Sequence, residues 1–209
     1  MSSTILVKTI AGAGLAGGMA GGSYLVSTYL FPRKDQFSNK TIQDHINSLK
    51  LKLISSLDKS KVAKQWEEEY KLDEANIKSA IPEAITWEKF RDWCETSLQL
   101  KKSEHENLVS KVQKWCTVGT IEDRISRKSG KSLISEEGFT SDWENIYTTN
   151  NQAADRKTLG LEENQNSGKK QTDIETIKSF CRVEKRKDFL ADKKGDSFDK
   201  VEKWCTKSN

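Results

Sequence analysis

The chain has 209 residues, of which 34% are apolar and 32% are charged, and its mean hydropathy is −0.74. Residues 1–34 contain three basic residues and no acid, so the formal net charge of +4 falls to +1 over the other 175 residues. A body so close to neutral argues against a nucleic-acid-binding protein, which needs concentrated positive charge. The polar composition and the two prolines argue against a β-sandwich or an α/β enzyme.

The amino-terminal segment, residues 1–34, is predicted to be a membrane anchor or a signal segment. Twenty-three consecutive residues of it carry no charge, which is enough for one helix to span a bilayer. Gly14, Gly18 and Gly22 follow the G-x-x-x-G spacing that lets two membrane helices associate. A cleaved signal peptide with Lys8 in its charged region, or a soluble glycine-rich arm, is the alternative.

Residues 41–117 and 120–206 contain a series of similar short motifs in the same order. The corresponding segments are Thr41–Ile46 and Thr120–Ile125, Leu53–Ser55 and Leu133–Ser135, Trp66–Tyr70 and Trp143–Tyr147, Phe90–Cys94 and Ile177–Cys181, and Lys111–Thr117 and Lys200–Thr206. Their offsets vary between 77 and 89 residues, as loop insertions would cause, and their order never changes. We therefore predict an internal duplication, with two homologous modules at 41–117 and 120–206.

The pattern within each module is helical, because apolar residues recur at every third or fourth position. Ser103-x-x-Glu106 and Thr172-x-x-Glu175 have the capping-box pattern that begins a helix. The stretch 148–170 is polar and rich in Asn, Gln and Gly, which predicts a mobile insertion in the second module. The predicted fold class is all-α: an N-terminal transmembrane or signal-anchor helix followed by two small bundles of about four helices each.

The four cysteines occupy corresponding places, two per module, and each directly follows an aromatic residue. Cys94 and Cys116 are 22 positions apart, and Cys181 and Cys205 are 24 apart, which suits two antiparallel helices joined by a turn. Four cysteines allow three pairings, and the repeat favours 94–116 with 181–205 as structural disulfides. Such disulfides would indicate an oxidising, exported compartment. Buried reduced cysteines are the alternative.

No catalytic, cofactor-binding or metal site is predicted. The cysteines lack the close C-x-x-C spacing of a zinc site and a positioned histidine for a catalytic thiol. Ser129–Ser132 imitates the end of a P-loop, but Ile125 stands where that motif needs glycine. Glu67–Glu69 is interpreted as a solvated helix face, because consecutive helical residues point in different directions.

Six tryptophans are present. Four of them are paired by the repeat at helical spacing and are predicted to lie in the core: Trp66, Trp115, Trp143 and Trp204. Trp87 and Trp93 have no tryptophan counterpart and are the candidate exposed aromatics for binding.

The opening MSSTILVKTIAGAGLAGGMAGGSYL and the two Lys-x-x-Lys-Trp-Cys-Thr endings resemble those of a known group of proteins. They are similar to the large paralogous families of uncharacterised membrane-anchored proteins of haemotropic mycoplasmas, the wall-less bacteria that live on red blood cells. The resemblance implies a membrane-tethered protein made in many variant copies and used in host contact or immune evasion. It transfers no functional residues, because these families have no assigned activity.

Together these features predict a non-enzymatic, single-pass protein of the cell membrane whose body is extracellular and stapled by disulfides. It would serve as a host-interaction or antigenic-variation module, with a host cell-surface protein as partner and no cofactor or nucleic acid. Self-association would run through Gly14, Gly18 and Gly22. A cytoplasm-facing membrane scaffold with reduced cysteines is the main alternative, and an enzyme whose site is assembled from distant residues is a third.

Overall fold

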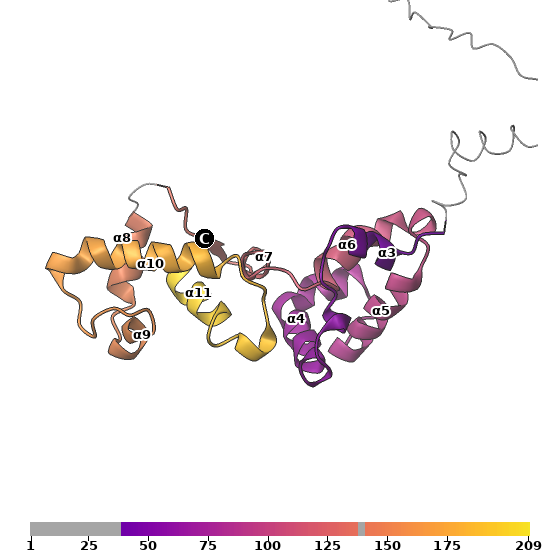
Figure 1. Cartoon of the computed structure of the whole chain (residues 1–209), viewed down its shortest axis with the longest axis horizontal. Helices are drawn as coiled ribbons and strands as arrows, with labels where there is room; N and C mark the ends of the chain where they lie inside the picture. Colours follow the sequence, from indigo (N-terminus) through magenta and orange to yellow (C-terminus); the bar gives the residue numbers. More distant parts are fainter. Residues whose placement is uncertain (1–38, 138–140) are drawn as a thin grey trace, which may run out of the picture. The chain divides into compact units, whose positions relative to one another are not determined.

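The structure, a computed structural model, describes residues 39–137 and 141–209 (Figure 1). The predicted anchor at 1–34, with Gly14, Gly18 and Gly22, lies outside the described residues. Within the described ranges, no helix combines the length and the apolar character needed to cross a membrane. These ranges are mostly helical, which confirms the predicted fold class at that level, and Asn39–Asn209 forms one compact unit.

The first half of this unit, residues 41–117, contains four α-helices. They are α3 (Ile42–Ser48), α4 (Lys59–Ala80), α5 (Trp87–Gln99) and α6 (Glu106–Trp115), with the 3-10 turns η1 (Ile54–Ser56) and η2 (Lys102–Glu104) between them. Helix α5 packs against α3, α4 and α6 (Figure 1). Its buried Phe90 meets Trp66 of α4 edge to face, with ring centroids 5.6 Å apart.

The second half, residues 120–206, has a separate hydrophobic core and continues into a short final strand. Its elements are α7 (Ile121–Ile125), β1 (Lys131–Leu133), α8 (Ser141–Thr149), α9 (Ala153–Lys157), η3 (Ser167–Lys169), α10 (Lys170–Glu184), η4 (Ala191–Lys193), α11 (Phe198–Cys205) and β2 (Thr206–Ser208). Helix α10 packs against α8 and α11. Strands β1 and β2 pair antiparallel, with Leu133 opposite Thr206. This small ribbon was not predicted, because strands of three residues are too short to show a period.

Among the helices whose first turns the structure describes, two begin with capping boxes, and these are not the two predicted ones. The hydroxyl of Thr41 accepts from the backbone of Asp44, whose carboxylate accepts from the Thr41 backbone, and Thr120 and Asp123 do the same. The predicted boxes are wrong. Ser103 lies in the 3-10 turn η2, and Thr172 lies within α10; neither α6 nor α10 has a side-chain cap.

Several backbone contacts occur in both halves. The amide of Ile54 donates to the carbonyl of Cys116 at 3.1 Å, and the amide of Ile134 donates to the carbonyl of Cys205 at 2.9 Å. Near the start of each half, Thr41 forms a β-bridge with Lys101, and Thr120 forms one with Asp188. In each half, the first residues are therefore bonded to a segment that precedes the second cysteine-bearing helix, and a later segment is bonded to the end of that helix.

The structure pairs Cys94 with Cys116 and Cys181 with Cys205, the connectivity that the repeat favours. The two Cα atoms lie 5.6 Å apart in both disulfides, and all four cysteines are buried. The first disulfide joins α5 to the end of α6, and the second joins α10 to the end of α11. Each disulfide therefore links the last two α-helices of its half.

The tryptophan predictions divide into two outcomes. The four repeat-paired tryptophans are 1–4% exposed, which confirms their place in the core. Trp87 and Trp93 are half-buried and pack against the core of the first half, so they are not the exposed aromatics that were predicted. Among the described residues, the large apolar side chains that are exposed are Leu49, Ile85 and Val183.

Residues 148–170, predicted to be a mobile insertion, contain α9 and a fully buried arginine. Arg156 donates to the carboxylate of Asp173 and to the carbonyl of Glu162, both at 2.7 Å. The Gln165 amide donates to the carbonyl of Tyr147 at 2.6 Å. The polar side chains that gave this stretch the composition of a loop therefore bond within the second half.

Candidate functional site

A cluster of buried charges joins the first half of the described chain to the second. Glu69 lies on the buried face of α4 and is 0% exposed. Its carboxylate accepts from Arg124 Nε of α7 at 2.7 Å and from Arg127 Nη1 just beyond α7, also at 2.7 Å. This corrects the prediction of a solvated face for Glu67–Glu69, since only Glu67 and Glu68 are partly exposed.

The two arginines also bind the end of the first half through its backbone. Arg124 Nη2 donates to the carbonyl of Thr117 at 2.8 Å, and Arg127 Nη2 donates to the carbonyl of Lys114. The Arg124 guanidinium carbon lies 5.9 Å from the centre of the Phe189 ring. Each guanidinium thus bonds both to Glu69 of α4 and to a main-chain carbonyl near the end of the first half.

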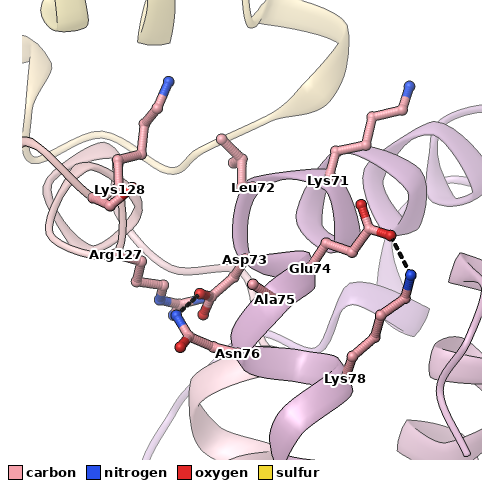
Figure 2. A pocket seen from close by; sticks show the side chains of 10 residues that line it. Lys71, Leu72, Asp73, Glu74, Ala75, Asn76, Lys78, Arg127 and Lys128 are labelled. Carbon is pink, nitrogen blue, oxygen red and sulfur yellow. Dashed lines mark hydrogen bonds and ion pairs between the residues drawn. The ribbon is translucent and has the colours of Figure 1, made fainter.

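A second buried acid, Asp73, lies one turn further along α4, where the helix is interrupted. Its backbone leaves the helical region (φ −137°, ψ 25°). Its carboxylate accepts from Trp115 Nε1 at 2.7 Å and from Asn76, and it pairs with Lys114 Nζ at 3.2 Å. Figure 2 shows Arg127 directed toward Asp73 from the segment after α7.

An uncharged contact lies beside the cluster. The Gln65 side-chain amide donates to the carbonyl of Phe189 at 3.0 Å and accepts from the amide of Ala191 at 2.8 Å. Gln65 is 1% exposed, and both of its amide ends bond to the main chain. The same face of α4 therefore holds the second half at two places, through the arginines of α7 and the segment after it, and through residues 189–191, where η4 begins.

Burial changes the proton affinities in this cluster. It raises the pKa of the Glu69 carboxyl above its ordinary value, and the charges of Arg124 and Arg127 oppose that rise. Burial also lowers the pKa of the Arg127 guanidinium, and the adjacent Arg124 charge lowers it further, whereas Glu69 raises it. The charge of Asp73 also raises the pKa of Arg127, so two acids act on this guanidinium.

The sequence gives only one signal for this cluster. Arg124 follows Ile121 and precedes Ile125 on the apolar stripe of its helix, where a charged residue needs a buried partner. In the proposed repeat, Arg124 corresponds to His45. Gln65, Glu69 and Asp73 carried no signal, because their partners are distant in the sequence.

This cluster of side chains holds α4 against α7 and the segment after it. It contains no nucleophilic side chain paired with a base. The cysteines are all in disulfides. Among the described residues, no three or more His, Cys, Asp or Glu side chains lie close enough to hold a metal ion. What the cluster does chemically is fix one half of the body against the other.

Comparisons of the chain with protein-family models, with curated proteins and with solved structures found no match.

Proposed function

We propose that this protein is a non-enzymatic, membrane-tethered surface protein whose body consists of two copies of one disulfide-stapled helical module. It serves as a host-interaction or antigenic-variation module, as the resemblance to the haemotropic-mycoplasma families implies. The uncharged stretch within residues 1–34 is its tether. Its partner is a protein of the host cell surface, bound through exposed helix faces.

The observation that carries the proposal is the pair of disulfides at corresponding positions. Disulfides persist in oxidising compartments and are rare where thiol reductants are abundant. Two bridges on two small cores are also what a secreted or displayed body requires, because cores of this size bury little apolar surface. Both points support a body on the outer side of the membrane.

The duplication is supported by contacts beyond the sequence motifs. The Thr117 hydroxyl donates to the carbonyl four residues earlier at 2.7 Å, and the Thr206 hydroxyl does so as well. The capping boxes, the bridges to the start of each half and the two disulfides follow the same correspondence. A constant scaffold of this kind leaves the exposed positions free to vary between copies of a family.

The test is to count thiols in the protein taken from its native cell. Lysates are blocked with a mass-tagged maleimide with and without prior reduction. The proposal expects no tagged thiols before reduction and four after it, since the chain has four cysteines. Four thiols tagged without reduction would contradict an exported body and favour the cytoplasm-facing scaffold with reduced cysteines.

A protease experiment on intact cells separates the same two functions independently. An extracellular body is digested before lysis, together with a known surface marker. A body that resists digestion until the cells are lysed lies inside them. Because this readout depends on topology alone, it does not depend on the redox state of the cysteines.

A further inference from the structure

A cleft of about 550 Å³ lies beside the buried charge cluster. This volume is in the range of sites that hold small molecules. Five cationic side chains line it: Lys50, Lys52, Lys114, Arg124 and Arg127. Two acidic residues, Asp123 and Asp188, also line it. The lining thus contains more cations than acids, although Glu69 pairs with both arginines and Asp73 pairs with Lys114.

The acids near this cleft are already engaged. Asp123 accepts from the backbone and hydroxyl of Thr120 in its capping box. Asp188 is 4.0 Å from Lys52 Nζ, the longest ion pair in the described part of the chain. Lys50 has no ion-pair partner among the described residues, and its side chain is exposed. Lys50 and Lys52 are therefore the cations with the most capacity left for a ligand.

The backbone at Lys50 is unusual. Its φ of 58° lies in the left-handed region, and no other described non-glycine residue has a positive φ. A lysine there is disfavoured relative to glycine, because its Cβ crowds the following carbonyl group. Lys50 directly follows the C-cap Leu49 of α3, and the amides of Lys50 and Leu51 donate to the carbonyls of Asn47 and Ile46, so this conformation ends the helix.

The wall of the cleft contains a buried donor without a partner. Arg124 Nη1 is fully buried and makes no hydrogen bond in the structure. It lies against Gly119, where the Cβ of any other residue would overlap it. Gly119 lines the cleft as well. Because Gly119 has no Cβ, the Arg124 guanidinium can lie directly beneath the wall of the cleft. A positive charge in this position attracts anions, since the surrounding protein has a low dielectric constant.

We propose that this cleft binds a small ligand bearing an oxyanion, a phosphate or a carboxylate group. Lys50 and Lys52 pair with the anion, and Arg124 and Arg127 contribute the field beneath it. The site uses residues from both halves of the chain, since the lysines follow α3 and the arginines belong to α7 and the segment after it. The proposed anion site does not depend on the compartment of the body or on the identity of the host partner.

The test is titration calorimetry of the full, oxidised chain in detergent micelles, with pyrophosphate and with citrate as probes at constant ionic strength. The variant Lys50→Gln/Lys52→Gln should bind at least about tenfold more weakly. The matched control is Lys59→Gln/Lys64→Gln, which removes two exposed lysines of α4 that do not line the cleft. The control should bind as the unmodified protein does.

A further variant separates binding from folding. Lys50→Gly removes the charge and relieves the left-handed backbone, so it should weaken binding while the unfolding midpoint stays equal or rises. Binding of pyrophosphate alone identifies a phosphate ligand, and binding of citrate alone identifies a carboxylate; each supports the site. Absence of binding to both probes, or equal weakening in the cleft and control variants, would overturn it.

Discussion

Glu69 is the carboxylate that two arginines of the second half share, and its side chain is fully buried. Its replacement by glutamine, Glu69→Gln, removes the counter-charge of the buried Arg124 guanidinium, whereas the less buried Arg127 still has Asp73 nearby. We expect the free energy of unfolding to fall by about 3–5 kcal/mol, because an uncompensated buried charge is costly. Urea unfolding at neutral pH measures this loss.

The matched control for that substitution is Glu67→Gln, on the exposed side of the same helix. Glu67 pairs with Lys71 at 2.7 Å, and both side chains are about half exposed. We expect a loss below about 1 kcal/mol, as for other solvent-exposed ion pairs. Equal losses for the two variants would mean that the buried cluster is not the element that stabilises the protein.

Position 119 requires glycine, because Arg124 occupies the space that a Cβ would fill. Since a Cβ there would overlap Arg124 Nη1, Gly119→Ala forces the guanidinium away from Thr117 and Glu69. We expect a loss of about 1–3 kcal/mol by urea unfolding, as for other overpacked positions. Gly195→Ala is the control, because a Cβ at Gly195 meets no atom within 4 Å. A Gly119→Ala protein as stable as this control would contradict the packing.

Single residues show why the cluster could not be predicted from the sequence. Arg124 and Arg127 are 55 and 58 positions from Glu69, so no local spacing relates them. The rule that consecutive helical residues face different ways was sound, but it does not say which of three glutamates faces inward. The burial of the four repeat-paired tryptophans could be predicted, because helical spacing on an apolar stripe is a local property of the sequence.

Among the elements, the disulfide between α5 and the end of α6 has a calculable effect. The variant Cys94→Ala/Cys116→Ala opens a loop of 22 residues. We expect a loss of about 3 kcal/mol in the free energy of unfolding, from the greater entropy of the unfolded chain. After full reduction of both proteins the difference should largely disappear. Equal stability of the two oxidised proteins would show that this disulfide contributes nothing.

Helix α11 is held to the segment around β1 by two ion pairs of Glu202 that respond to pH. Burial acts to raise the pKa of Glu202, but hydrogen bonds from Lys128 and Lys131 outweigh it and hold the pKa below its ordinary value of 4.5. A lowered folded-state pKa stabilises the protein above that ordinary value, and the contribution is lost as pH falls through the folded value.

Glu202→Gln should therefore lower the free energy of unfolding by up to about 1 kcal/mol at neutral pH. The difference from the unmodified protein should shrink as the pH falls below 4.5. Thermal melts over a pH series measure it. A difference that is constant with pH would assign the effect to packing and not to charge.

The elements could be predicted where a pattern was long enough. Stripes of three or more apolar residues predicted helices, and the proposed repeat favoured, among three possible pairings, the one that the structure has. The capping boxes were assigned to the wrong threonine and serine, because Thr-x-x-Glu and Ser-x-x-Glu also occur inside a helix and across a 3-10 turn. The true boxes have aspartate in place of glutamate.

At the scale of the whole described body, the cluster on α4 couples the two halves. Hydrogen exchange followed by mass spectrometry can detect this coupling. We expect Glu69→Gln to raise the exchange of α7 as well as that of α4, because it releases Arg124. Glu67→Gln should leave α7 unchanged. Faster exchange confined to α4 would mean that the halves unfold independently.

The contacts of α4 also bear on whether copies of this body can form chains. In the proposed duplication, Trp66 corresponds to Trp143, so Gln65 and Glu69 correspond to Asp142 and Ile146 of α8. Ile146 packs against the core of its own half, and Asp142 pairs with Lys207. At these two positions α8 therefore lacks the buried acid and the amide with which α4 holds the second half, so a further module could not dock on α8 through the same contacts.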